Sequence, residues 1–154
     1  MEEKTEDVLF QTQASRKLVD LIERSADELS RNYITEIGRD PRMPTYKTLD
    51  ADDLYGRTYS VYSQLGKWIS RETSREEIKA YWKGLGRRRR QEGFPFSEIV
   101  LSLSHERLLL WRKIEADGLL DTALDLYQAL DLQHRVLVFF DLALFYAALG
   151  YEES

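Results

Sequence analysis

The end of the chain is the segment that most constrains its fold. Residues 136–149 read VLVFFDLALFYAAL, so thirteen of these fourteen residues are apolar and the exception is Asp141. A helix that is apolar on every side is expected to be buried on every side. An ionised carboxylate in such a place is costly unless another group pairs with it. The segment therefore predicts a central helix that contains an internal polar contact.

Length and composition place the chain among ordinary soluble domains. It has 154 residues, enough for one domain with a sizeable core. The net charge of −5 argues weakly against a nucleic-acid partner, and the lack of cysteine excludes a disulfide or a thiolate metal site. The N-terminus is acidic and lacks the pattern of a signal peptide. The apolar tail falls short of the roughly 20 residues of a membrane span, so we predict a cytoplasmic protein.

Apolar residues recur at three- and four-residue spacing through most of the chain, which predicts an all-α fold. The expected architecture is a single bundle of five to six helices over residues 15–151, with an apolar C-terminal core helix. The polar residues 1–14 are expected to form a flexible N-terminal segment.

Capping residues and helix breakers predict where the helices begin and end. We expect a first helix over residues 15–37 and a second that begins after Asp50. Residues 73–76 read TSRE, a capping box that would open the third helix. The fourth is expected from Pro95 to Asp117, and the remainder is helical, with Asp131 as a candidate point of division.

Residues 87–90 form a run of four arginines, which suggests either an anion site or a solvated helix end. The solvated end is the more common situation. At roughly 100° per residue, Arg89 falls in the apolar stripe of its helix, Arg88 lies at the edge of that stripe and Arg87 points away. We therefore expect one or two of these arginines to turn inward.

Two further features suggest an internal ion pair. Arg107 lies among the apolar residues of the fourth helix, and Arg107 or Arg89 is the expected partner of Asp141. A structural role for this pair is favoured over a switch. His134 shares the helix face of Asp141; we favour a hydrogen-bonded structural histidine over a haem ligand.

A second apolar patch lies on the other side of the fourth helix, where His105 stands among Leu101, Leu108 and Leu109. This patch predicts an interface between subunits. The chain has no Gly-rich phosphate loop, no H-E-x-x-H and no G-x-S-x-G. We therefore predict a protein that is not an enzyme, with no catalytic, cofactor-binding or metal-binding residues.

Two segments together resemble a known family. Residues 85–98 read LGRRRRQEGFPFSE and residues 139–146 read FFDLALFY. They resemble the N-terminal sensor domain of RsbT co-antagonist proteins, the RsbRD type, over roughly residues 15–151. The matching residues are Arg87, Arg88, Arg89, Gly93, Pro95, Phe140 and Asp141. Leu142 departs from the pattern, because family members usually have arginine or another polar residue after the aspartate.

The resemblance implies a bacterial signal-input and dimerisation domain of stress-response (stressosome) or two-component signalling. It implies a homodimer with a globin-related bundle that lacks haem. The partner implied is an output domain, a kinase or an anti-sigma regulator of the same pathway. We recognise no output domain in this sequence, so the chain would be a stand-alone copy or one that ends at a domain boundary.

The alternative function is a small-molecule or haem-binding helical sensor. It is suggested by two aromatic clusters, one of Tyr55, Tyr59 and Tyr62 and the other of Phe139, Phe140 and Phe145.

Overall fold

A computed structural model of the chain describes residues 15–70 and 73–154, so the predicted flexible segment lies outside the described residues. Within them the fold is all-α, as predicted, with no strand. Its elements are α2 (Arg16–Arg24), α3 (Ala26–Arg39), the short 3-10 helix η1 (Tyr46–Thr48), α4 (Ala51–Ser63), α5 (Leu65–Ile69), α6 (Arg75–Gln91), α7 (Phe96–Asp117) and α8 (Ala123–Glu152).

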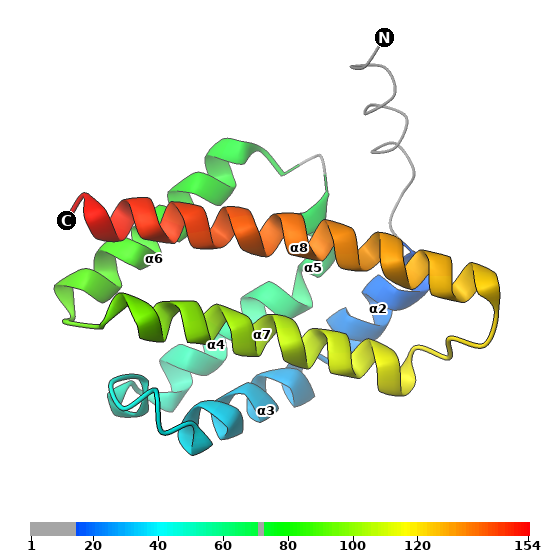
Figure 1. The fold of residues 1–154 in the computed structure, drawn as a ribbon, viewed down its shortest axis with the longest axis horizontal. Helices are drawn as coiled ribbons and strands as arrows, with labels where there is room; N and C mark the ends of the chain where they lie inside the picture. Colours follow the sequence, from blue (N-terminus) through cyan, green and yellow to red (C-terminus); the bar gives the residue numbers. More distant parts are fainter. Residues whose placement is uncertain (1–14, 71–72) are drawn as a thin grey trace, which may run out of the picture.

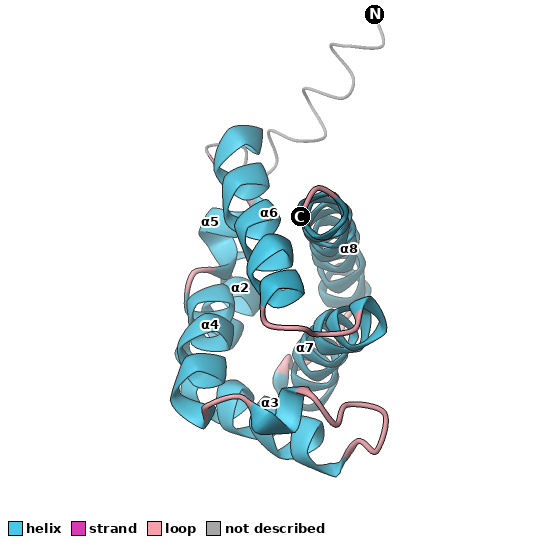
Figure 2. Ribbon diagram, turned by 90° about the vertical axis from the view of Figure 1, so that its left-hand side faces the viewer, coloured by secondary structure: helices cyan, strands magenta, loops and turns pink. Residues whose placement is uncertain are grey.

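The two longest helices, α7 and α8, lie side by side and form one side of the bundle (Figure 1). Seen from the end, α4, α5 and α6 form the opposite side, and α3 lies next to α7 (Figure 2). The C-terminal half of α8 packs against α6. The last two helices therefore each have one side that faces the bundle and one that faces away from it.

The predicted helix ends are close to those observed, with corrections at the first and third predicted helices. The first helix is divided at Ser25, whose N–H bonds back to the carbonyls of Leu21 and Ile22. The cap of α6 is Ser74, whose hydroxyl accepts from the N–H of Glu77, so the capping residue is one position later than expected. Thr73 instead donates to the carbonyl of Lys67, which ties this turn to α5.

The α8 helix is continuous over 30 residues, so Asp131 does not divide it. Asp131 accepts instead from Arg135 one turn later, at 3.0 Å, which supports the helix. A complete capping box of Thr122 and Asp125 begins the helix.

Two glycines allow α6 and α8 to cross with their backbones in contact. A Cβ built on Gly86 would collide with the carbonyl oxygen of Ala147, and one built on Gly150 would collide with that of Lys83. Gly84, two residues before Gly86 and therefore on nearly the opposite side of α6, has open space around it. Only glycine permits so close an approach, so these two positions fix which side of α8 faces inward.

The predicted burial of α8 on every side is wrong. Its inner side, with Phe139, Phe140 and Ala143, is buried, but Leu137 and Phe145 are exposed. By length and composition α8 could cross a membrane, contrary to the expectation from the tail alone. Core helices of soluble proteins meet the same criterion, and α8 packs along α6 and α7.

Candidate interaction surface

Asp141 lies on the outer side of α8 and is exposed, so the predicted internal ion pair of this residue is wrong. Among the described residues no arginine lies within ion-pair distance of its carboxylate. Arg107 is half-buried and lines a cleft between α7 and α8. His134 is exposed on the same side of α8 as Asp141, and its ring makes no hydrogen bond among the described residues, so the prediction of a hydrogen-bonded structural histidine is wrong.

Of the arginine run, Arg89 alone turns inward, as its place in the apolar stripe predicted. Its guanidinium lies over the rings of Tyr46 and Phe94 and donates to Glu92 at 3.0 Å. Arg88 is exposed. Arg89 therefore stabilises the turn between α6 and α7, with a partner on its own helix end in place of Asp141.

The internal ion pair of this protein joins Arg57 on α4 to Glu106 on α7. Nη1 of Arg57 lies 2.8 Å from Oε1 of Glu106, and the two side chains are 8% and 0% exposed. Burial raises the pKa of Glu106, while Arg57 and Thr58 oppose that rise. Burial disfavours the charge on Arg57, but Glu106 and nearby tyrosines outweigh it and raise the pKa of the guanidinium. A pair in this environment is costly to break, because either partner alone would be a buried, uncompensated charge.

Hydroxyl groups from three helices surround this pair. Arg57 donates to Tyr33 Oη at 2.9 Å and to Ser102 Oγ at 3.1 Å, and those two hydroxyls share a hydrogen bond of 2.5 Å. Thr58 donates to Glu106 at 3.1 Å. Tyr62 donates to the backbone carbonyl of Glu106 at 2.7 Å. The network joins α3, α4 and α7 from within the core.

This network does not follow from the sequence, because the apolar residues place the core side of α7 about a quarter turn from its true position. The apolar residues centred the predicted side beside Arg107, whereas the buried residues include Ser102 and Glu106. The available signal was that Glu98, Ser102 and Glu106 recur at four-residue spacing. From sequence alone, a polar stripe of this kind is expected to face solvent, because nothing in α7 shows that Arg57 of α4 packs against it.

His105 does not lie in an exposed apolar patch, which corrects the second prediction for α7. Its Nε2 lies 2.8 Å from Oδ2 of Asp40, and that carboxylate also binds Arg42 at 2.9 Å. The Arg42 guanidinium and His105 hold the pKa of Asp40 well below its usual range. Of the three leucines beside His105, Leu109 is buried, Leu101 is half-buried and Leu108 is exposed.

The interior does not offer a histidine to a haem. His105 is engaged by Asp40 and His134 lies on the outside of α8. Of the two aromatic clusters, Tyr55 and Tyr59 stack on each other at the surface, and Phe145 is exposed. The buried rings of Trp68, Trp82 and Phe139 pack on one another and fill the space between α5, α6 and α8.

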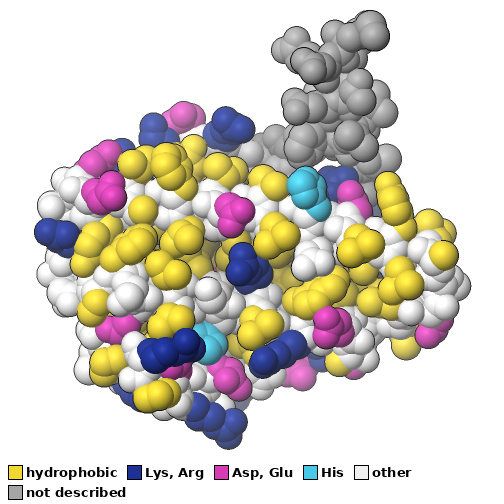
Figure 3. Space-filling view, viewed as in Figure 1, with side chains coloured by type: hydrophobic (Ala, Val, Ile, Leu, Met, Phe, Trp, Pro, Cys, Tyr) yellow, Lys and Arg dark blue, Asp and Glu magenta, His cyan; other side chains and the backbone are white. Residues whose placement is uncertain are grey.

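Exposed apolar side chains gather on the outer side of α7 and α8. Of the ten large hydrophobic side chains exposed in the described residues, six lie on this side, one on α7 and five on α8. Hydrophobic side chains follow both helices on this side of the molecule (Figure 3). We call outer face the set of Leu108, Trp111, Tyr127, Leu130, His134, Leu137, Val138, Asp141 and Phe145.

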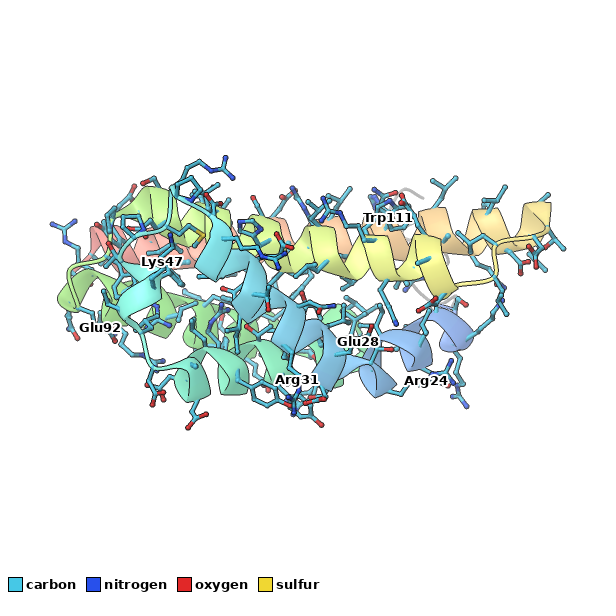
Figure 4. All side chains as sticks on the ribbon, turned by 90° about the horizontal axis from the view of Figure 1, so that it is seen from below. Arg24, Glu28, Arg31, Lys47, Glu92 and Trp111 are labelled. Atoms are coloured by element: carbon cyan, nitrogen blue, oxygen red, sulfur yellow. The ribbon has the colours of Figure 1, made fainter. Side chains whose placement is uncertain are left out.

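A cleft of about 320 Å³ opens on the outer face between α7 and α8. It is lined by Leu108 and Trp111 from α7 and by Leu137 from α8, with Arg107 at its edge. Trp111 points away from the bundle, on the side opposite Arg31 (Figure 4). The outer face is therefore hollowed where its two helices meet.

A second cleft of about 400 Å³ lies between α5, α6 and α8. Trp68, Ile78, Val138 and Phe139 line its apolar part.

Within residues 15–70 and 73–154, no group of three or more His, Asp or Glu side chains could hold a metal ion. Comparisons with known protein families, curated proteins and solved structures return no match for this chain.

Proposed function

We propose that the chain is a non-enzymatic signal-input and dimerisation domain whose interface is the outer face of α7 and α8. The observation that carries this proposal is the concentration of exposed apolar side chains on one side of two adjacent helices. Exposed apolar side chains scattered singly need no explanation, but a contiguous apolar patch usually marks an interaction site.

The size of the outer face suits a protein partner. Its part on α8 runs from Tyr127 to Phe145, about 30 Å at 1.5 Å per residue. With α7 beside it, the patch is about 20 Å wide and on the order of 600 Å². A stable interface buries about 800 Å² on each partner, so the outer face supplies most of what a dimer needs.

The signalling role is supported by the resemblance to RsbT co-antagonist sensor domains. In such a dimer α8 would lie at the centre of the interface, a position from which a signal can change how the two copies pack. The core network of Arg57 and Glu106 would hold each protomer rigid while the two copies move relative to each other.

Sedimentation velocity over a hundredfold concentration range tests the proposal. We expect the wild-type chain to approach twice the monomer mass, and Leu137→Glu to remain monomeric because it places a charge at the centre of the interface. Tyr59→Glu is the matched control, since Tyr59 is an exposed large hydrophobic on α4, outside the outer face. A wild-type chain that stays monomeric, or that binds lipid vesicles instead of itself, would contradict the proposal.

A second candidate function, a sensor of a small apolar molecule, is favoured by the cleft beside Trp68. Its volume lies at the lower end of the range of ligand pockets. Quenching of tryptophan fluorescence by apolar ligands, lost in Val138→Phe, would support it. Equal quenching in that variant would count against binding at this cleft.

A further inference from the structure

The exposed residues of α8 between positions 130 and 145 are spaced symmetrically about the middle of this segment, and a basic side chain on one side of the middle matches an acidic one on the other. They are Leu130, His134, Leu137, Val138, Asp141 and Phe145. In order, their side chains are apolar, basic, apolar, apolar, acidic and apolar. The spacing of three and four residues places all six on one stripe of the helix.

The centre of this pattern lies between Leu137 and Val138. When the helix is placed antiparallel to a copy of itself about that point, Leu137 faces Val138 of the second copy and Leu130 faces its Phe145. His134 then faces Asp141, and by symmetry Asp141 faces His134. A two-fold interface requires this reciprocity, in which residue i contacts j and j contacts i.

From this complementarity we infer that two copies of the chain associate through antiparallel α8 helices centred between Leu137 and Val138, with two reciprocal His134–Asp141 contacts. The inference rests on the proposed dimerisation and adds its orientation and register. It also accounts for Asp141, the single acidic residue of the apolar tail, which has no ion-pair partner among the described residues of its own chain.

The parallel arrangement is disfavoured by charge. In a parallel pair each residue faces its own copy, so Asp141 would face Asp141 and His134 would face His134. The two Asp141 carboxylates would repel each other across an apolar interface, whereas a carboxylate that faces an imidazole can be paired and fixes the register. A polar residue within an apolar seam commonly selects one register in this way.

Cross-linking tests the orientation directly, because the chain has no cysteine of its own. With a short bis-maleimide, Val138→Cys should cross-link to itself. Leu130→Cys and Phe145→Cys should each fail alone, since the two copies of position 130 lie about 22 Å apart along the helices. An equimolar mixture of these two variants should cross-link.

The outcomes separate this inference from the proposed function. If Leu130→Cys and Phe145→Cys each cross-link to themselves while the chain sediments as a dimer, the antiparallel register is wrong and dimerisation stands. If no variant cross-links and the chain is monomeric, both are wrong.

A charge exchange tests the reciprocal contact. His134→Glu should weaken dimerisation by about tenfold or more because it opposes two carboxylates, and Asp141→Lys should do the same because it removes the carboxylate that His134 faces. The double variant should return the dissociation constant to within a few-fold of wild type. Asp53→Lys, an exposed aspartate on α4, is the control for the change in net charge. A double variant as weak as the product of the two single effects would overturn the contact.

Discussion

The inner side of α7 and the outer side of α8 each carry a carboxylate among apolar residues, and the two carboxylates differ in burial and in pairing. Glu106, on the inner side, is fully buried, paired with Arg57 and bonded by Thr58. Asp141, on the outer side, is exposed among apolar side chains and has no ion-pair partner among the described residues of its chain. The inner carboxylate is satisfied by its own protomer, whereas the outer one is available to a second molecule. The difference shows that an aspartate in an apolar segment can indicate an interface as well as a core.

Removal of the inner carboxylate should have the largest effect on stability. Glu106→Ala leaves the Arg57 guanidinium buried without its partner and should lower the free energy of unfolding by about 3–5 kcal/mol. Urea denaturation measures this. The double variant Arg57→Met/Glu106→Leu should recover most of the loss, because no charge remains to be buried. A loss under about 1 kcal/mol in Glu106→Ala would mean that the pair is accessible to water.

The glycine crossing of α6 and α8 should show the next largest effect. Gly86→Ala or Gly150→Ala forces the two backbones apart and should cost about 1–3 kcal/mol. Gly84→Ala is the matched control on the same helix, since its new methyl group meets open space; it should be neutral or stabilising by up to about 1 kcal/mol. Thermal unfolding compares the three variants. Equal effects at positions 84 and 86 would argue against the close crossing.

A smaller effect that depends on pH is expected at Asp40, which joins the loop after α3 to His105 on α7. The pKa of Asp40 is lowered in the folded state, so its contribution to stability is complete above the unfolded value of about 3.9 and is lost as pH falls below it. Asp40→Asn should therefore destabilise the chain at pH 6, and the difference from wild type should shrink by pH 3. Asp121→Asn, an exposed aspartate, is the control. A difference that is the same at both pH values would contradict this role.

The smallest effect on folding is expected for the outer carboxylate. Asp141→Ala, measured at a concentration low enough to dissociate the dimer, should change the free energy of unfolding by less than about 0.5 kcal/mol. A loss approaching that of Glu106→Ala would show that Asp141 has an intramolecular role and would remove the contrast between the two sides.

Local signals were enough to predict the all-α class and most helix ends, because capping residues and breakers act within one turn. The inward turn of Arg89 followed from helix geometry alone. Helix geometry could not predict which side of α8 faces the core, because the apolar residues surround this helix almost evenly. The choice depends on Gly86 and Gly150, which allow contact between two helices distant in sequence.

The internal ion pair could not be predicted either, because it also depends on contact between helices that are distant in sequence. Arg57 and Glu106 meet across α4 and α7, and neither stands out in its own helix. Asp141 stood out because of its neighbours, which led to a buried pair being predicted for it. In the structure Asp141 still lies among apolar side chains, but at the surface of the molecule.

The distance between two spin labels attached to Tyr127→Cys tests the central claim most directly. Antiparallel α8 helices centred between Leu137 and Val138 place the two labels about 30 Å apart along the helices, within the range of pulsed dipolar spectroscopy. We expect a single distance near that value. A much shorter distance would indicate parallel helices, and the absence of any dipolar signal at concentrations that should favour the dimer would show that the outer face does not bind a second copy of the chain.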